Sequence, residues 1–253
     1  MANTANISCH DSCNANSSMN IVSFNIRGFN ALKRDYVRCL LDKCEVLLLQ
    51  EHWLSESQLV ELGHINPRYF YHGICGFDNS DILSGRPYGG CAIFWRSDIV
   101  AVVETVNTGS RRLCCIRMSS DTWRLLIVNV YLPYEDDDNS SDEFMVQLSN
   151  IEYLINQHAD CHVIIGGDFN VDFYRHRSHT DLLINFCERM IMTPSVRHTN
   201  YRVDYTYHFN MYRFNTLDHF IVSGCLFNSI CFVDVIHDGV NLSDHDPLVM
   251  QIS

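Results

Sequence analysis

The sequence predicts one α/β domain in which two β-sheets pack together with helices on the outside. Three observations support this class. Strand-like and helix-like segments alternate along most of the chain, and no stretch after residue 18 has the composition of a linker. The run Val46–Leu49 is wholly apolar, as expected of a strand that is covered on both faces. Many strands with interspersed helices are typical of such layered domains.

In the first half of the chain, strands are predicted from apolar runs and helices from apolar residues at helical spacing. The helix over Arg34–Lys43 rests on Val37, Leu40 and Leu41. A second helix over Ser55–Leu62 begins at a serine that can cap it. The predicted strands of this half are Met19–Asn25, Val46–Leu49, Cys91–Arg96, Ile99–Val103, Leu113–Met118 and Trp123–Tyr131.

The second half is predicted to hold the longest helix, from Asp142 to about Gln157. Its apolar residues at helical spacing are Phe144, Leu148, Ile151, Leu154 and Ile155. A shorter helix is predicted over Asp181–Met190. The predicted strands are Val163–Ile165, Val203–Phe209, Thr216–Val222, Ile230–Ile236 and Leu248–Ile252. The last strand stops abruptly, as in a domain cut from a longer protein, although a natural terminus would look the same.

The composition narrows the class of protein. A hydrophobic content of 47% is enough for a core, and 19% charged residues argue against wholesale disorder. A net charge of −12 argues against a simple basic surface for nucleic acid. No segment approaches the ~18 apolar residues of a membrane helix. Residues 1–18 are polar and lack the apolar core of a signal peptide, so we expect a flexible leader before a domain over residues 19–253.

The twelve cysteines are predicted to be buried free thiols in a reducing compartment. No C-x-x-C pair occurs, which gives little support to a structural zinc site. Most cysteines lie in apolar segments, such as Cys91 in GGCAIFWR and Cys161 before HVIIGG. In such segments a thiol behaves as a small hydrophobic group. A disulfide framework remains the alternative.

Polar residues at the ends of apolar strands are the features that point to chemistry. Strand ends gather at one edge of a sheet, where ligands of α/β folds bind. Each residue alone also has a structural explanation as a cap or turn residue. The set is Asn25, Glu51, Asn129, Tyr131, Asp168, Asn170, Asp218 and the triplet Ser243, Asp244 and His245.

Taken together, these residues and their flanks resemble the endonuclease/exonuclease/phosphatase superfamily, which includes DNase I-like nucleases and abasic-site endonucleases. The resemblance runs from about Met19 to Ser253, through SFNIRG, LLLQEHW, VNVYLP, IIGGDFN, YTYH, LDHFIVS and LSDHDPL in that order. It implies a four-layer α/β sandwich, with two packed mixed β-sheets flanked by helices. It also implies a metal-dependent hydrolase of phosphodiester bonds.

Within the superfamily, the blocks NIRG, QEHWL, RPYGGCAIFWR and LDHFIVS look like the apurinic-endonuclease-like endonuclease domain of a non-LTR (LINE-type) retrotransposon. Such domains usually precede a reverse transcriptase in one polyprotein. The resemblance also implies a nuclear site of action. One residue differs from the motif of the repair enzymes. Abasic-site endonucleases typically carry Asp two residues after the first Asn, and this chain has Arg27 there. The missing carboxylate leaves the number of metal ions open.

The site residues have the following expected roles. Glu51 is the expected ligand of Mg²⁺, for which Mn²⁺ can substitute, because Mg²⁺ prefers hard oxygen ligands. Asn25 and Asp244 are further metal-ligand candidates. By resemblance, Asp168 would orient and deprotonate the attacking water, Asn170 would hold a phosphate oxygen, and His245 would donate to the phosphate with Asp218 fixing its tautomer. Tyr131 would sit at the phosphate or the leaving oxygen, and packing is its alternative role.

Double-stranded DNA is the expected substrate, and a nick with a 5′-phosphate and a 3′-hydroxyl that primes reverse transcription is the implied product. The candidate DNA contacts are Thr206, Tyr212 and Arg213, in and beside the hairpin segment His208–Asn215, together with Arg175 and Arg177. An ordinary hairpin tip and a solvated loop are the alternatives for these segments. Thr206 is also a candidate for internal support of the site.

Three further classes of function stay open. They are an abasic-site repair endonuclease, a phosphatase or phosphodiesterase acting on a lipid, an inositol phosphate or RNA, and a catalytically silent binding module. The net charge does not exclude DNA. Six acids lie within residues 134–143 and four are site acids, which leaves 20 acids against 18 bases elsewhere. We therefore expect weak, salt-sensitive DNA affinity.

Overall fold

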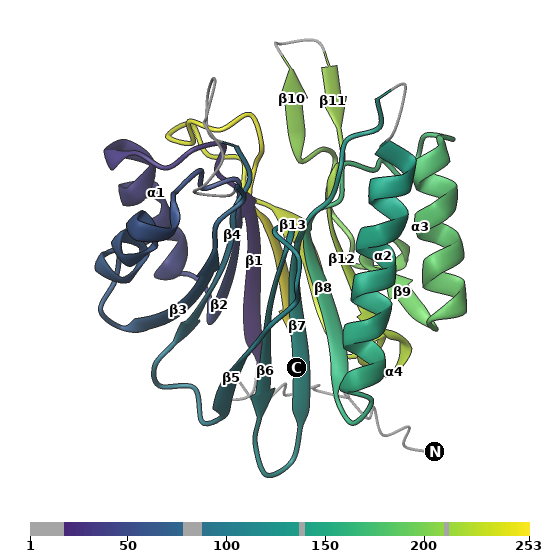
Figure 1. The fold of residues 1–253 in the computed structure, drawn as a ribbon, viewed down its shortest axis with the longest axis horizontal. Helices are drawn as coiled ribbons and strands as arrows, with labels where there is room; N and C mark the ends of the chain where they lie inside the picture. Colours follow the sequence, from purple (N-terminus) through teal and green to yellow (C-terminus); the bar gives the residue numbers. More distant parts are fainter. Residues whose placement is uncertain (1–17, 78–87, 137–139, 210–212) are drawn as a thin grey trace, which may run out of the picture.

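The computed structural model describes residues 18–77, 88–136, 140–209 and 213–253. It contains two six-stranded mixed sheets and a two-stranded ribbon (Figure 1). The first sheet has the order β13 (Ile230–Val235), β14 (Leu248–Ile252), β1 (Met19–Asn25), β2 (Val46–Gln50), β4 (Cys91–Arg96) and β3 (Tyr69–Ile74). The second has the order β5 (Val102–Val106), β6 (Leu113–Ser119), β7 (Arg124–Tyr131), β8 (His162–Asp168), β12 (Asp218–Ser223) and β9 (Met192–Pro194).

Helices cover the outer face of each sheet, so the layers run helix, sheet, sheet, helix (Figure 1). The helix α1 (Ala31–Leu41) and the 3₁₀ helix η1 (Glu56–His64) pack on the first sheet, and α2 (Ser140–Gln157) and α3 (Ser178–Arg189) pack on the second. Two short segments, η2 (Ser195–Arg197) and α4 (Gly224–Phe227), complete the helices of the described chain. The predicted four-layer sandwich is confirmed.

Side-chain alternation along β2 explains its all-apolar sequence. Leu48 points between the sheets, where it packs with Ile127 and Phe220 of the second sheet. Its neighbours Leu47 and Leu49 point outward against α1. Because successive strand residues face opposite sides, a strand between two cores needs apolar residues at every position. One core thus lies between the two sheets and one between the first sheet and α1, and a third lies between the second sheet and the helices α2 and α3.

Several predicted elements differ from the structure. The predicted helix over Ser55–Leu62 is a 3₁₀ helix, which begins with a capping box between Ser55 and Gln58. The sequence did not predict β3, an edge strand with one buried and five less buried residues and therefore no apolar run. The predicted strand Val203–Phe209 is reduced to β10 (Tyr207–Phe209), which pairs with β11 (Arg213–Asn215) in the ribbon.

The ten cysteines of the described residues are free thiols, and six of them are buried. The expectation of buried free thiols is thus confirmed for most of these positions, while Cys39 and Cys225 are exposed. Within the described segments, no helix is both long and apolar enough to cross a membrane. The leader predicted over residues 1–18 falls almost wholly outside the described residues and stays a prediction.

Candidate active site

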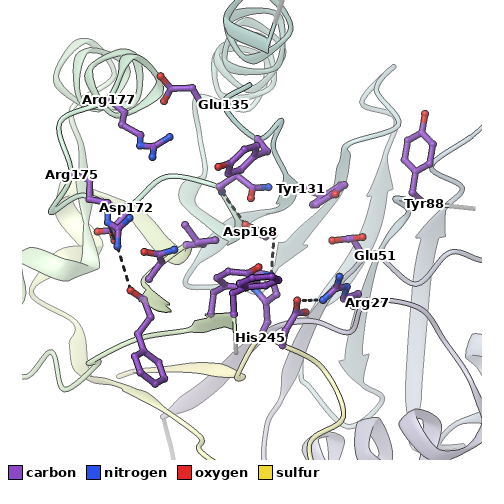
Figure 2. Close-up of a pocket in the computed structure, with 18 of the residues that line it drawn as sticks. Arg27, Glu51, Tyr88, Tyr131, Glu135, Asp168, Asp172, Arg175, Arg177 and His245 are labelled. Carbon is purple, nitrogen blue, oxygen red and sulfur yellow. Dashed lines mark hydrogen bonds and ion pairs between the residues drawn. The ribbon is translucent and has the colours of Figure 1, made fainter. Parts of the chain in front are cut away.

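The polar residues at the strand ends meet in one open pocket of about 950 Å³, at the end of the sandwich that carries the ribbon (Figures 1 and 2). The predicted site residues that line it are Glu51, Tyr131, Asp168, Asn170, Arg175, Arg177, Asp244 and His245. Asn25 and Asp218 are fully buried and bond to residues of the pocket floor. The carboxyl ends of the parallel pairs β1–β2 and β7–β8 deliver these groups to one edge.

Asn25 joins the two sheets at the floor of the pocket. Its Nδ2 donates to Glu51 Oε1 at 2.8 Å, within the first sheet, and to Asp168 Oδ2 at 2.9 Å, at the end of β8. The second oxygen of Glu51 accepts a hydrogen bond from Trp53 Nε1 at 3.0 Å. Glu51 itself has a positive φ of 54°, a conformation that is uncommon outside glycine and often found at functional sites.

A second bridge between the sheets lies deeper and involves a residue to which sequence analysis gave no role. Gln50 Nε2 donates to Asn129 Oδ1 at 2.7 Å, and Asn129 Nδ2 donates to the carbonyl oxygens of Leu49 and Ala92 at 2.9 Å each. Both side chains are fully buried. Buried polar groups of this kind fix one packing arrangement because any other leaves them unpaired. The bridge therefore sets the register of the two sheets directly behind Glu51.

His245 lies between two carboxylates. Its Nδ1 is 2.8 Å from Asp218 Oδ2, and its Nε2 is 3.9 Å from Asp168 Oδ2. All three side chains are buried. Burial alone would lower the pKa of His245, but the charges of Asp218 and Asp168 outweigh it and raise that pKa to about 10. The ring is therefore a cation that can donate from Nε2.

Asp168 is the carboxylate that is placed to act as a base. Burial raises its pKa above the usual value of a carboxyl group, against the lowering effects of His245 and of the hydrogen bond from Asn25. Its Oδ1 accepts the backbone N–H of Asn170 at 2.9 Å. Asn170 is held in turn by a bond from its Nδ2 to the Leu132 carbonyl oxygen at 2.9 Å, which leaves its second N–H available.

The loop before β14 is held from two sides. Ser243 Oγ donates to the Asn25 carbonyl oxygen at 2.7 Å, and Asn241 Nδ2 donates to the His245 carbonyl oxygen at 2.7 Å.

Thr206 Oγ1 accepts the backbone N–H groups of Leu217 and Asp218 at 3.0 Å each. Thr206 is fully buried, so it supports Asp218 from inside and offers no surface to DNA. This placement corrects the prediction of a DNA contact for Thr206.

Tyr131 stands at the pocket wall, and its ring lies 5.3 Å from the guanidinium carbon of Arg112. Burial raises the pKa of Tyr131, and the charges of Glu51 and Asp168 raise it further. The phenol therefore keeps its proton and can act as a hydrogen-bond donor toward the pocket. Arg112 also forms an ion pair with Glu143 at 2.6 Å.

The rim of the pocket is more exposed than its floor. Phe209 and Phe214 of the ribbon line the pocket and are 51% and 46% exposed. Arg175 forms an ion pair with Asp172 at 3.3 Å, and Arg177 faces the pocket beside Glu135 (Figure 2). Tyr212 lies outside the described residues, and of Arg213 only the backbone, in β11, is described. The antiparallel pair of β10 and β11 lies where the sequence predicted a hairpin, at His208–Asn215.

Two groups of side chains could hold a metal ion. Among the described residues, Asp168, Asp218 and His245 bring three ligand atoms within 4.8 Å of one another. In that group, however, His245 is a cation whose Nδ1 is already bonded to Asp218, which disfavours a metal. Glu51 and Asp244 instead offer carboxylate oxygens, the ligands that Mg²⁺ prefers, while Asn25 donates from Nδ2 to Glu51 and accepts the Arg27 backbone N–H at Oδ1. Oδ1 of Asp244 is a buried acceptor without a hydrogen-bond partner, as is Oδ1 of Asp218 in the first group. The second set contains no histidine cation and fits a hard divalent ion.

Asp244 has one further contact that the sequence did not indicate. Its Oδ2 forms an ion pair with Nη1 of Arg27 at the edge of the pocket (Figure 2). Sequence analysis noted Arg27 only as a departure from a family pattern. Its position in the sequence could have indicated a role: Arg27 directly follows Asn25 and Ile26 at the end of the predicted strand and precedes Gly28.

Comparison with known proteins supports the same class. Residues 22–245 match the endonuclease/exonuclease/phosphatase family. An AP endonuclease from Leishmania major is similar in structure, with a TM-score of 0.74 and 15% identity, covering 93% of this chain and 87% of that one. No curated protein sequence matches the chain significantly.

Two other solved structures are similar. The endonuclease domain of TRAS1, a telomere-specific non-LTR retrotransposon, has a TM-score of 0.69 and 14% identity over 93% of this chain and 98% of that one. The 3′ phosphatase NExo from Neisseria, bound to a product DNA hairpin, has a TM-score of 0.71 and 18% identity over 93% and 99%. At these identities the likeness establishes the fold.

Proposed function

The chain belongs to the endonuclease/exonuclease/phosphatase family, and from this premise we propose that it is a Mg²⁺-dependent endonuclease that nicks double-stranded DNA. The observation that carries the proposal is the row Asp168–His245–Asp218 beside Glu51 at the floor of an open pocket. This row supplies a base and a cationic donor 3.9 Å apart, which is the pair that phosphodiester hydrolysis needs.

Glu51 would hold the metal ion, with Asp244 Oδ1 as a further ligand and Asn25 supporting the ion through its hydrogen bond to Glu51. The bound ion neutralises charge on the phosphate and favours attack on it. Trp53 and Asn25 both hold the Glu51 carboxylate, so its oxygens are oriented before any ion binds. Such preorganisation avoids the cost of moving the ligands during the reaction. Mn²⁺ would substitute because it also takes oxygen ligands.

The remaining residues act on the water and the phosphate. Asp168 would orient the attacking water and accept its proton as the new oxygen–phosphorus bond forms. The bond from phosphorus to the 3′ oxygen then breaks, which leaves a 5′-phosphate and, after protonation, a 3′-hydroxyl. His245 Nε2 would donate to the phosphate, while Asp218 holds Nδ1 and keeps the ring charged. Asn170 and Tyr131 would donate to phosphate oxygens from the pocket wall.

DNA, rather than a small phosphate ester, is favoured by the rim. Phe209 and Phe214 stand on a ribbon beside the pocket with about half of their surface exposed. Aromatic side chains on such a projection suit contact with bases in the minor groove. Arg175, whose Nη2 donates to the Phe214 carbonyl oxygen at 3.5 Å, and Arg177 also line the pocket and suit phosphate contacts. A small substrate would need none of these outer groups.

We further propose that the domain serves a non-LTR retrotransposon, in which the 3′-hydroxyl of the nick primes reverse transcription. The support is the set of sequence blocks NIRG, QEHWL, RPYGGCAIFWR and LDHFIVS. On this view the chain is part of a larger polyprotein with a reverse transcriptase, and it acts in the nucleus.

The proposal is tested with supercoiled plasmid in Mg²⁺. The wild-type protein should convert it to open circles whose ends carry a 3′-hydroxyl and a 5′-phosphate. Glu51→Gln should slow nicking by about 10²-fold or more, whereas Glu61→Gln, an exposed glutamate of η1, should not. Equal rates for wild type and Glu51→Gln would sink the metal assignment. Cleavage confined to abasic duplexes would identify repair, and hydrolysis of inositol phosphates without nicking would identify a phosphatase.

A further inference from the structure

Arg27 is a cationic residue beside the proposed metal site that no step of the proposed reaction uses. It lies in the turn after β1, lines the pocket with Glu51, and has about half of its side chain exposed. Its Nη1 is bonded to Asp244 Oδ2. Figure 2 shows this contact in the pocket that Glu51 also lines. A permanent cation therefore stands next to the acidic oxygens of the proposed metal site.

The backbone holds Arg27 in place more tightly than an exposed arginine requires. Its φ is 49°, in the left-handed region that costs a non-glycine residue roughly 1 kcal/mol or more. The backbone N–H of Arg27 donates to Asn25 Oδ1 at 3.0 Å, and Lys33 Nζ donates to the Arg27 carbonyl oxygen at 2.8 Å. Strain of this kind persists only where surrounding contacts impose it.

The same turn is joined to the residues that hold Glu51. Gly28 N donates to the Glu51 carbonyl oxygen at 2.7 Å, and Gly28 has a positive φ of 88°. A Cβ at this position would meet the Trp53 ring at 2.3 Å, so only glycine allows the approach. Trp53 in turn donates to Glu51 Oε2. The backbone of Arg27 and the Glu51 carboxylate are thus fixed relative to one another.

The consequence concerns the number of cations that the site can hold. A guanidinium is a permanent cation in proteins, and in this structure Arg27 Nη1 occupies Asp244 Oδ2. Asp244 then has only Oδ1 left for a divalent ion. A second ion would need Oδ2 and would stand against the fixed positive charge of Arg27. The guanidinium keeps further N–H groups, which form a fork suited to phosphate oxygens.

We propose that Arg27 is a built-in cation of this site: it fills the place of a second divalent ion, limits the site to one, and binds a non-bridging oxygen of the substrate phosphate. The inference rests on the proposed function, because it presumes the metal site at Glu51. It makes Arg27 a catalytic residue and gives the strained geometry of its turn, from Asn25 to Gly28, a chemical purpose.

The first test counts bound Mn²⁺ per chain by electron paramagnetic resonance of the free ion, with no DNA present. Wild type should bind one Mn²⁺, and Arg27→Lys, which keeps the charge, should also bind one. Arg27→Ala should bind two, because both oxygens of Asp244 become available. Two ions in the wild type, or one ion in Arg27→Ala, overturns the proposal. If Arg27→Ala does not fold, Arg27→Gln carries the same expectation.

The second test separates this inference from the proposed function. Glu51→Gln should lose the single Mn²⁺ of the wild type; if it does not, the metal assignment fails, whatever Arg27 does. In saturating Mg²⁺, Arg27→Ala should lower kcat for plasmid nicking by about 10- to 100-fold. Arg34→Ala removes a charge in α1, away from the pocket, and should leave kcat unchanged. An unchanged kcat in Arg27→Ala contradicts the phosphate contact.

Discussion

The floor and the rim of the pocket are built in opposite ways. The floor consists of side chains at strand ends, and Asn25, Asp168, Asp218 and His245 are all buried. They bond to one another at 2.8 to 2.9 Å, apart from the longer Asp168–His245 contact. The rim consists of the ribbon and loops, where Phe209 and Phe214 are about half exposed.

This difference indicates a division of labour. A floor whose polar groups are already paired needs little reorganisation during the reaction, so it suits the chemical step. A rim with exposed aromatic and basic side chains can adapt to a large ligand, so it suits DNA binding. Changes at the floor should therefore lower the rate of nicking with DNA affinity intact, and changes at the rim should do the reverse.

The largest effect is expected at the floor from His245→Ala. It removes the cationic donor and leaves Asp218 and Asp168 as buried carboxylates without their shared partner. Plasmid nicking in saturating Mg²⁺ should fall by about 10³- to 10⁴-fold. Binding of duplex DNA in Ca²⁺ should change little. The control is His158→Ala, at the end of α2 and away from the pocket. A large loss of DNA affinity in His245→Ala would break the division between floor and rim.

A smaller effect at the floor is expected from Asp218→Asn, which keeps the shape of the side chain and removes its charge. His245 would lose the carboxylate that fixes its ring, and nicking should slow by about 10- to 100-fold. The same variant distinguishes the two candidate metal sites. If Glu51 holds the ion, Mn²⁺ affinity should stay at the wild-type value. A loss of Mn²⁺ affinity would place the ion instead on the group of Asp168, Asp218 and His245.

The floor was largely predictable from sequence, because polar residues that end apolar strands are conspicuous. Asn25, Glu51, Asp168, Asp218 and His245 all lie at the pocket or directly beneath it. Their partners were harder to predict. The Gln50–Asn129 bridge depends on how two sheets pack, and the Arg27–Asp244 pair joins residues 217 positions apart. The hydrophobic periodicity of a local segment does not indicate which residues, far apart in the chain, come into contact.

The rim was only partly predictable for a related physical reason. A hairpin was expected near residues 208–215, and the ribbon β10–β11 stands there. The longer strand Val203–Phe209 was wrong because residues before Tyr207 use their backbone bonds elsewhere. The Asp204 carbonyl oxygen accepts from Thr216 Oγ1, and Thr206 O accepts from Asp246 N. These tertiary contacts replace the strand pairing that the apolar pattern favoured.

A moderate effect is expected at the rim from Phe214→Ala. Removing an aromatic group that contacts a base costs about 1–3 kcal/mol of binding, which is roughly 5- to 150-fold in the dissociation constant for duplex DNA. The kcat for nicking at saturating DNA should change by less than about threefold, since no floor contact is touched. Phe70→Ala serves as control, because Phe70 is also about half exposed, on β3, but does not line the pocket. Unchanged affinity would show that the ribbon does not contact DNA.

The smallest effect is expected where the rim meets the floor, at His237. Its Nδ1 and Nε2 lie 2.9 Å from Asp246 Oδ2 and Asp204 Oδ1, and its ring lies 4.4 Å from that of Tyr205, which packs on Phe214. Burial lowers the pKa of His237, but the hydrogen bonds and charges of Asp204 and Asp246 outweigh it and raise that pKa above its usual value.

A histidine whose pKa is raised on folding stabilises the folded state fully at pH values below the unfolded pKa of about 6.5, and the contribution disappears as pH rises through the folded pKa. His237→Gln should therefore lower the free energy of unfolding at pH 5 to 6 by about 0.5–1 kcal/mol, the scale of a partly exposed ion pair. The difference from wild type should shrink as pH rises, measured by urea unfolding across this range. A pH-independent difference would mean that His237 contributes by packing alone. The ion pairs of His237 with Asp204 and Asp246 would then contribute no stability, and this link between rim and floor would be absent.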